Sequence, residues 1–180
     1  MSVRARVHAA LAAVGLTAAL VTIPTAAASA DSCPTPIGLN GSNIVLRVNT
    51  GFGQHSDTTI GNLYLGYFGG TCRQTYAEIR WNGSPDPASG TIYINDPFNT
   101  AVGKVNFNVP AGYTGTSTSG LISIDHDPWN TAYPYPKSFQ AAAVINIDNN
   151  YCVTTIATAA HQYSTGGISG SSDTTCTTHL

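Results

Sequence analysis

Three residue types that favour long helices, methionine, glutamate and lysine, are scarce in the chain. It has one methionine, one glutamate (Glu78) and two lysines, Lys104 and Lys137, among 180 residues. Because these residue types have high helix propensity, their scarcity argues against a helical fold. Valine, isoleucine, threonine and aromatic residues are well supplied instead, and glycine, serine and asparagine separate them. This composition is typical of a β-rich domain and not of a disordered chain.

Charged residues are also scarce. They make up 9% of the sequence, with seven lysines and arginines against nine aspartates and glutamates. The basic residues beyond residue 30 are scattered and form no basic stripe, so nucleic acids and anionic membrane surfaces are poor partners. No apolar run reaches the roughly 20 residues of a membrane helix, and we expect no membrane span in the mature chain.

The first 30 residues have the three parts of a secretory signal peptide. Arg4 and Arg6 give a positively charged start, residues 7–23 are apolar and alanine-rich, and residues 28–30 read Ala-Ser-Ala. This order of charge, apolar stretch and small residues is what signal peptidase recognises. We therefore predict cleavage after this triplet and a secreted, extracellular protein with one mature domain, residues 31–180.

All four cysteines lie in the mature part, at Cys33, Cys72, Cys152 and Cys176. An even number in an exported chain predicts two disulfides, for which three connectivities exist. We favour Cys33–Cys72, which ties down the N-terminal segment, with Cys152–Cys176, which ties the C-terminal tail to a predicted strand. No Cys-x-x-Cys spacing occurs and no two histidines lie four residues apart, so we predict no metal and no other cofactor.

Short alternating runs separated by turn residues recur through the mature part. In the run 73–81, Thr75, Ala77, Ile79 and Trp81 share one face, and the residues between them share a wetter face. About eight such runs predict an all-β fold, an antiparallel sandwich or partly open barrel. They span residues 43–49, 62–68, 73–81, 91–95, 104–109, 121–125, 139–147 and 151–159.

Some segments have a less definite interpretation. The Ala-rich residues 140–144 fit a helical turn as well as a strand. The Gly/Thr/Ser-rich residues 111–119 are expected to form a loop, and the polar residues after Ala160 carry no strand prediction. The apolar residues of the run 104–109 are expected on one half-buried face.

The segment 63–79 resembles a strand pair of a known family. It reads Leu-Tyr-Leu-Gly-Tyr-Phe and then, from Cys72, Cys-Arg-Gln-Thr-Tyr-Ala-Glu-Ile. The pattern is similar to that of the YjfA-like proteins, small secreted Gram-positive proteins of unknown function. Gly66, Phe68 and Tyr76 stand where those proteins have Arg, Ser and Trp. The resemblance implies a secreted β domain and assigns no catalytic or binding residue.

The densest group of polar and aromatic residues lies between residues 125 and 137. Prolines at three positions remove backbone donors, so the segment is expected to be a surface connection and not a strand. Rigid aromatic faces beside carboxylates suit a sugar ring, which has apolar faces and hydroxyl groups. The alternative to a binding loop is a purely structural connection that covers one end of the core. The candidate ligand-binding residues are Asp125, Asp127, Trp129, Tyr133 and Tyr135.

Oxygen ligands in this segment would also suit calcium. Asp125, Asp127 and Asn130 could coordinate it, but Trp129 stands where an EF-hand loop needs another oxygen ligand. Only a calcium ion with ligands from elsewhere in the chain stays open.

These features predict a secreted, non-catalytic binding domain for a glycan or a cell-envelope component. Two alternatives stay open: a secreted inhibitor or effector that acts on another protein, and a small secreted hydrolase. Residues 115–120 lack the Gly-x-Ser-x-Gly spacing of a hydrolase nucleophile. Glu78 is the only glutamate, which excludes a glutamate pair for glycoside hydrolysis but not an aspartate pair. A dispersed triad of Asp, His and Ser remains open as well. Because the sequence contains no hydrolase signature, we lean towards a protein that is not an enzyme.

Overall fold

The computed structural model describes most of the mature part of the chain. The described residues are 33, 35–51, 54–125, 137–148, 152–169 and 173–179, so the predicted signal peptide lies outside them. They form twelve strands in two sheets and no helix, which confirms the all-β prediction. None of these residues belongs to a helix long and apolar enough to cross a membrane.

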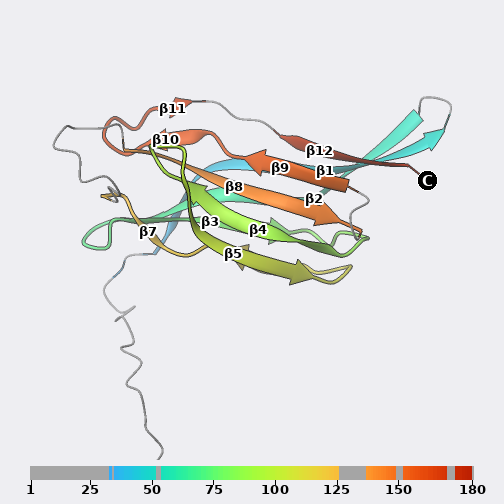
Figure 1. Cartoon of the computed structure of the whole chain (residues 1–180), viewed down its shortest axis with the longest axis horizontal. Coiled ribbons are helices and arrows are strands. Elements are labelled where there is room, and N and C mark those ends of the chain that lie inside the picture. The colour runs from blue at the N-terminus through green and yellow to red at the C-terminus, as the bar shows by residue number, and fades with distance from the viewer. Residues whose placement is uncertain are drawn as a thin grey trace, which may run out of the picture. The chain divides into compact units, whose positions relative to one another are not determined.

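The first sheet has six strands in the order β12-β1-β2-β3-β6, with β7 also paired to β3 (Figure 1). Its strands are antiparallel except for β1 and β12, which run parallel. Their bounds are β1 (Ile37–Gly51), β2 (Gln54–Phe68), β3 (Gln74–Trp81), β6 (Thr116–Thr118), β7 (Ile122–Ser123) and β12 (Thr174–His179).

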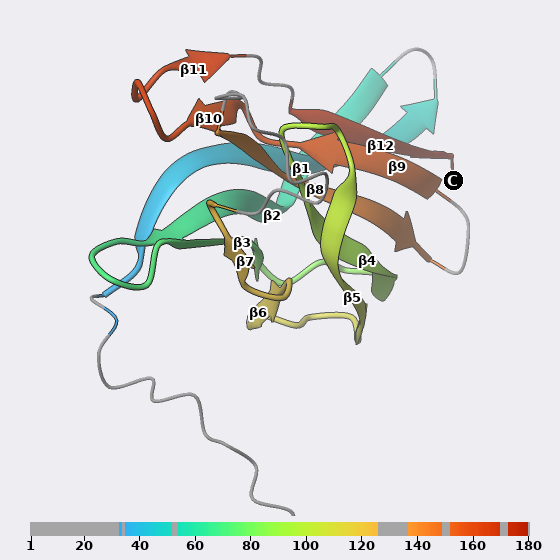
Figure 2. The same ribbon diagram turned by 60° about the vertical axis from the view of Figure 1, so that its left-hand side comes forward.

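The second sheet also has six strands, in the order β11-β10-β8-β4-β5, with β9 also paired to β8. All its pairs are antiparallel, including that of the consecutive strands β8 and β9. The two sheets face each other across one apolar core, and Figure 2 shows β4 and β5 of the second sheet on one side and β2 and β3 of the first on the other. The bounds are β4 (Ala88–Asn95), β5 (Ala101–Val109), β8 (Ser138–Ile147), β9 (Cys152–Ala157), β10 (Ala160–Gln162) and β11 (Ile168–Ser169).

Strand β3 shows how the sequence builds this core. Thr75, Ala77, Ile79 and Trp81 are all buried, and the residues between them are half-buried or exposed, as their alternation predicts. The Ala-rich centre of β8 is a strand and not a helical turn, because residues 140–147 pair continuously with β4. The small alanines at positions 141–143 are all buried in this central strand.

Several buried hydroxyl groups belong to the core as well. The Ser117 hydroxyl accepts a hydrogen bond from Trp81 Nε1 at 3.0 Å. Ser119 Oγ accepts the backbone N–H of Ala77 at 2.9 Å, and Thr158 Oγ1 accepts that of Ala141 at 3.2 Å. Each hydroxyl satisfies a donor that burial would otherwise leave unpaired. A core of this kind explains how a chain so rich in serine and threonine folds.

Four strands, and the exposed fraction of one side chain, differ from the sequence-based expectations. Strand β6 lies within the predicted loop 111–119, and β10, β11 and β12 lie in the polar part after Ala160. These strands are short or lie at sheet edges, so they show little apolar alternation. Val105 is 40% exposed instead of half-buried, because β5 is the edge strand of the second sheet. Phe107 on the same strand does pack against the core.

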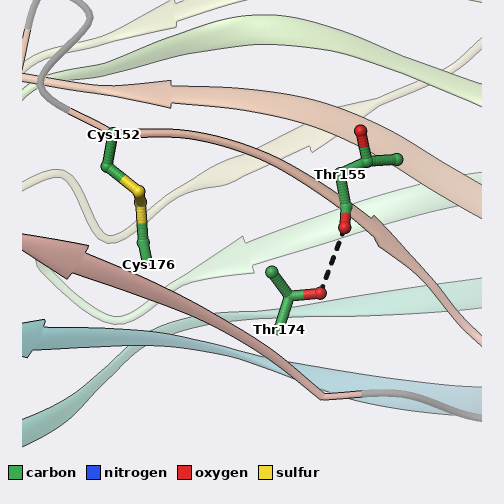
Figure 3. The surroundings of a disulfide bond; sticks show 4 residues. All are labelled: Cys152, Thr155, Thr174 and Cys176. Carbon is green, nitrogen blue, oxygen red and sulfur yellow. Dashed lines mark hydrogen bonds between the residues drawn. A yellow bond between two sulfur atoms is a disulfide. The ribbon is translucent and has the colours of Figure 1, made fainter.

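Both predicted disulfides are present. Cys33 is bonded to Cys72 with their Cα atoms 5.6 Å apart, and Cys152 to Cys176 with theirs 5.9 Å apart. The second bond joins β9 of one sheet to β12 of the other, and the Thr174 hydroxyl donates to the Thr155 carbonyl beside it (Figure 3). Along this side the two sheets are therefore held by a covalent bond as well as by packing.

Candidate functional site

The structure describes one of the five predicted ligand-binding residues, Asp125. The other four, Asp127, Trp129, Tyr133 and Tyr135, lie outside the described residues. Ligand binding through them stays a prediction, as does calcium binding. The described part of the chain contains no group of three or more His, Cys, Asp or Glu residues that could hold a metal ion.

Ion pairs of the Asp125 carboxylate connect the two ends of segment 126–136. Arg73 Nε donates to Asp125 Oδ2 at 2.9 Å, and Arg73 Nη2 donates to Oδ1 at 3.2 Å. Lys137 forms an ion pair with the same carboxylate. Since Asp125 directly precedes the segment and Lys137 directly follows it, this pair closes the base of the segment. The hydrogen bonds from Arg73, and then from Lys137, hold the pKa of Asp125 below its usual range.

Arg73 is placed by the turn between β2 and β3. It follows Cys72 of the first disulfide and has a φ angle of 43°, in the left-handed region. Its carbonyl accepts the backbone N–H of Ile124 at 2.9 Å, which brings the end of β7 next to this turn. The disulfide and the hydrogen bond together fix the guanidinium beside Asp125.

A cleft of about 440 Å³ opens beside these three charged residues. We call it the loop-base cleft. The first sheet contributes Tyr67 of β2 with Ile37 and Leu39 of β1, and Arg73 and Ile124 lie next to them. The other wall, from the second sheet and its turns, contains Lys137, His161, Tyr163 and Ser164.

Tyr163 is the best-fixed group in the loop-base cleft. Its ring centroid lies 4.8 Å from that of Tyr67, 4.8 Å from that of His161 and 5.8 Å from that of Phe139. Its hydroxyl donates to Thr75 Oγ1 at 2.9 Å, a bond that links the two sheets. Burial strongly raises the pKa of the Tyr163 phenol, so it stays protonated.

Among the described residues that line the cleft, His161 alone has a buried side-chain polar atom without a hydrogen-bond partner. Its Nδ1 is buried and has no hydrogen-bond partner among the described residues. Burial lowers the pKa of this imidazole, so it is neutral at pH 7. A neutral imidazole has one nitrogen that can donate a hydrogen bond to a ligand and one that can accept a hydrogen bond from it.

No family model, curated protein or solved structure matches the chain. The resemblance of residues 63–79 to the YjfA-like proteins therefore stays a prediction. Residues 63–68 and 74–79 do form an antiparallel pair, β2 with β3.

The arrangement suits binding of a polar ligand that also has apolar faces. Two tyrosine rings and three aliphatic side chains give apolar surface, and charged and polar side chains line the rest of the cleft. Arg73 and Lys137 outnumber Asp125, so these three groups carry one net positive charge. The sequence interpretation missed Tyr67, Tyr163 and His161, because they lie in segments far apart in the chain. The only local signal was the His-Gln-Tyr triplet at 161–163 in an otherwise polar tail.

Proposed function

We propose that this protein is a secreted, extracellular, non-catalytic binding domain for a glycan of the cell envelope or its surroundings. The observation that carries the proposal is the pair of tyrosine rings, Tyr67 and Tyr163, 4.8 Å apart in a cleft of about 440 Å³. The two disulfides support an extracellular location, because such bonds persist in oxidising compartments. The predicted signal peptide supports the same location.

The charges of the loop-base cleft favour an acidic sugar. An aromatic wall packs against the apolar face of a sugar ring, and rim groups bond its hydroxyls. Arg73 and Lys137 share a single carboxylate, Asp125, which leaves one positive charge to attract a ligand carboxylate. We therefore place a uronic acid ring, or a sugar with a similar acidic group, in the cleft.

The test is calorimetric titration with oligogalacturonate. In Arg73→Gln we expect the affinity to fall about tenfold or more, the scale of one lost hydrogen bond to a charged group. Lys104→Gln is the matched control, because Lys104 is an exposed cation on β5 outside the cleft. Absence of any binding of acidic glycans by the wild-type protein, or equal affinities of the two variants, would overturn the proposal.

The predicted loop residues need a separate variant. Trp129→Ala is titrated with the same oligosaccharide. Weaker binding would extend the site from the cleft onto segment 126–136, as the sequence predicts. An unchanged affinity would restrict the site to the cleft and remove Trp129 from it.

One observation favours a second candidate, a secreted inhibitor of another protein. The ion pair of Asp125 with Lys137 and the disulfide next to Arg73 hold the base of segment 126–136. Inhibitory loops need such a fixed base, because a preorganised loop loses less conformational entropy on binding. Incubation with a panel of secreted proteases tests this candidate, and lack of inhibition across the panel ends it. For the third candidate, a small hydrolase, the described residues provide no favourable observation.

A further inference from the structure

The outer face of the first sheet has two tyrosines that lie flat across neighbouring glycines. Tyr64 on β2 pairs with Gly41 on β1, and Tyr76 on β3 pairs with Gly66 on β2. A Cβ atom at residue 66 would lie 2.3 Å from Tyr76 Cζ, and one at residue 41 would lie 2.9 Å from Tyr64 Cε1. The two rings therefore occupy the space that side chains at these positions would fill, as aromatic residues do over glycine in sheets.

Three further side chains continue this surface. The Phe68 ring lies 5.3 Å from that of Tyr76, with an interplanar angle of 33°. The Arg80 guanidinium lies over the Tyr64 ring, 4.5 Å from its centroid, and forms an ion pair with Glu78. We call these five residues the outer strip: Tyr64, Phe68, Tyr76, Glu78 and Arg80.

Two hollows adjoin the outer strip. One of about 300 Å³ is lined by Phe68, Tyr76 and Glu78 together with Thr118 of β6. The other, of about 190 Å³, is lined by Tyr64 and Arg80 together with β1. Glu78 lines one hollow and Arg80 lines the other, so this ion pair lies between the two hollows on a path across the strands.

The polar groups along this path are uncharged or already paired. The only charged residues of the outer strip, Glu78 and Arg80, neutralise each other. A row of amides crosses the same face: Asn62 Nδ2 donates to Asn43 Oδ1 at 2.6 Å, and Asn82 Nδ2 donates to Asn62 Oδ1 at 3.3 Å. Flat rings beside amides and hydroxyls complement a ligand with apolar ring faces, many hydroxyls and no charge.

We propose that the outer strip is a second binding site, which takes a neutral polysaccharide segment lying across β1, β2, β3 and β6. Tyr76 with Phe68 stacks one sugar ring, and Tyr64 with its covering guanidinium supports the next. This site lies on the outer face of the sheet, whereas the loop-base cleft lies between the two sheets. The inference therefore stands independently of acidic-glycan binding in that cleft.

The sharpest test displaces a ring without removing it. In Gly66→Ala the new methyl group forces the Tyr76 ring off the sheet, because the contact would otherwise be 2.3 Å. Gly167→Ala is the matched control, since Gly167 lines neither hollow and a Cβ there comes no closer than 3.3 Å to any atom, the flexible Thr165 hydroxyl. Tyr76→Ala is a second variant, which removes the ring and needs no backbone adjustment. The thermal unfolding midpoint of each variant establishes that it folds.

Binding is measured by depletion on insoluble cellulose, mannan and chitin, and by titration with their soluble hexasaccharides. We expect binding of at least one of these neutral glycans, weakened about tenfold by Gly66→Ala and by Tyr76→Ala and unchanged by Gly167→Ala. Arg73→Gln should leave it unchanged, which separates this site from the loop-base cleft.

Three outcomes would overturn the inference. The first is that the wild-type protein binds none of the three neutral glycans. The second is that folded Gly66→Ala and Tyr76→Ala bind as tightly as Gly167→Ala. The third is a dimer that dissociates in Gly66→Ala, measured by analytical ultracentrifugation, because the outer strip would then be occupied by a second copy of the chain.

Discussion

At the scale of single residues, the ion pairs of Asp125 make the stability of the fold depend on pH. Asp125 bonds two cations that come from opposite sides of the loop-base cleft. Its depressed pKa means that the folded protein favours the ionised carboxylate more than the unfolded chain does. The resulting stabilisation is present above the unfolded pKa and is lost as the pH falls through the lower, folded value.

Removal of Arg73 should therefore raise the pKa of Asp125 towards its ordinary value, because Arg73 is the largest cause of the depression. We expect this in Arg73→Ala, measured by NMR titration of the side-chain carboxyl carbons. Asp57 is an internal control, since its own pKa is lowered by Arg47 on another part of the first sheet. An unchanged Asp125 midpoint, or an equal shift at Asp57, would contradict this assignment.

A second residue-scale prediction concerns the buried hydroxyl of Ser119. In Ser119→Ala the backbone N–H of Ala77 loses its acceptor inside the core. We expect the free energy of unfolding to fall by about 1–3 kcal/mol, the cost of an unpaired buried donor. Ser56→Ala, at an exposed position of β2, should change stability by less than about 0.5 kcal/mol in the same urea titration. A loss at residue 119 no larger than at residue 56 would mean that the N–H finds another partner.

Among the secondary-structure elements, predictability from sequence follows the apolar alternation. Strand β3 could be predicted because every second residue is buried and its neighbours are wetter. Strand β12 could not, because among its described side chains, at residues 174–177, Cys176 alone lies in the core and threonines surround it. Strand β6 is similar, since its buried residue is Ser117, whose burial depends on the distant Trp81.

The candidate site was less predictable than the fold for a related reason. Tyr67 and Tyr163 are brought together only when the two sheets pack, and no spacing along the chain indicates this. Asp125 was predicted as part of a local cluster with the residues that follow it. Its described partners are Arg73 and Lys137 instead, and the first of these lies 52 residues away.

The Cys152–Cys176 disulfide should decide whether β12 stays on the first sheet. Little else buries this strand, so we expect replacement of both cysteines by serine to lower the free energy of unfolding by about 2–4 kcal/mol. Hydrogen exchange should become faster at residues 174–179 and along the paired part of β1. The matched control replaces Cys33 and Cys72 by serine, which should leave exchange in β12 unchanged. Equal exchange of β12 in both variants would show that the strand holds without its disulfide.

At the scale of the whole molecule, the two disulfides make the stability of the fold depend on the redox conditions around it. One ties the N-terminal segment to the β2–β3 turn, and the other ties the two sheets together. Neither bond would persist in a reducing cytosol. A chain that depends on both should therefore reach its full stability only after export, which is what the predicted signal peptide would provide.

Processing of the full chain is the prediction at this scale. Expressed in a secreting host, the protein in the medium should begin at Asp31, because Ala28-Ser29-Ala30 offers the small residues that signal peptidase requires. Intact-mass measurement with alkylation before and after reduction tests both halves: four thiols should appear only after reduction. Ala30→Trp places a bulky side chain at the cleavage position and should leave the precursor uncut, while Ala27→Ser should be processed normally. Secreted protein that retains Met1, or that has a free thiol before reduction, would contradict the argument that export and oxidation complete this fold.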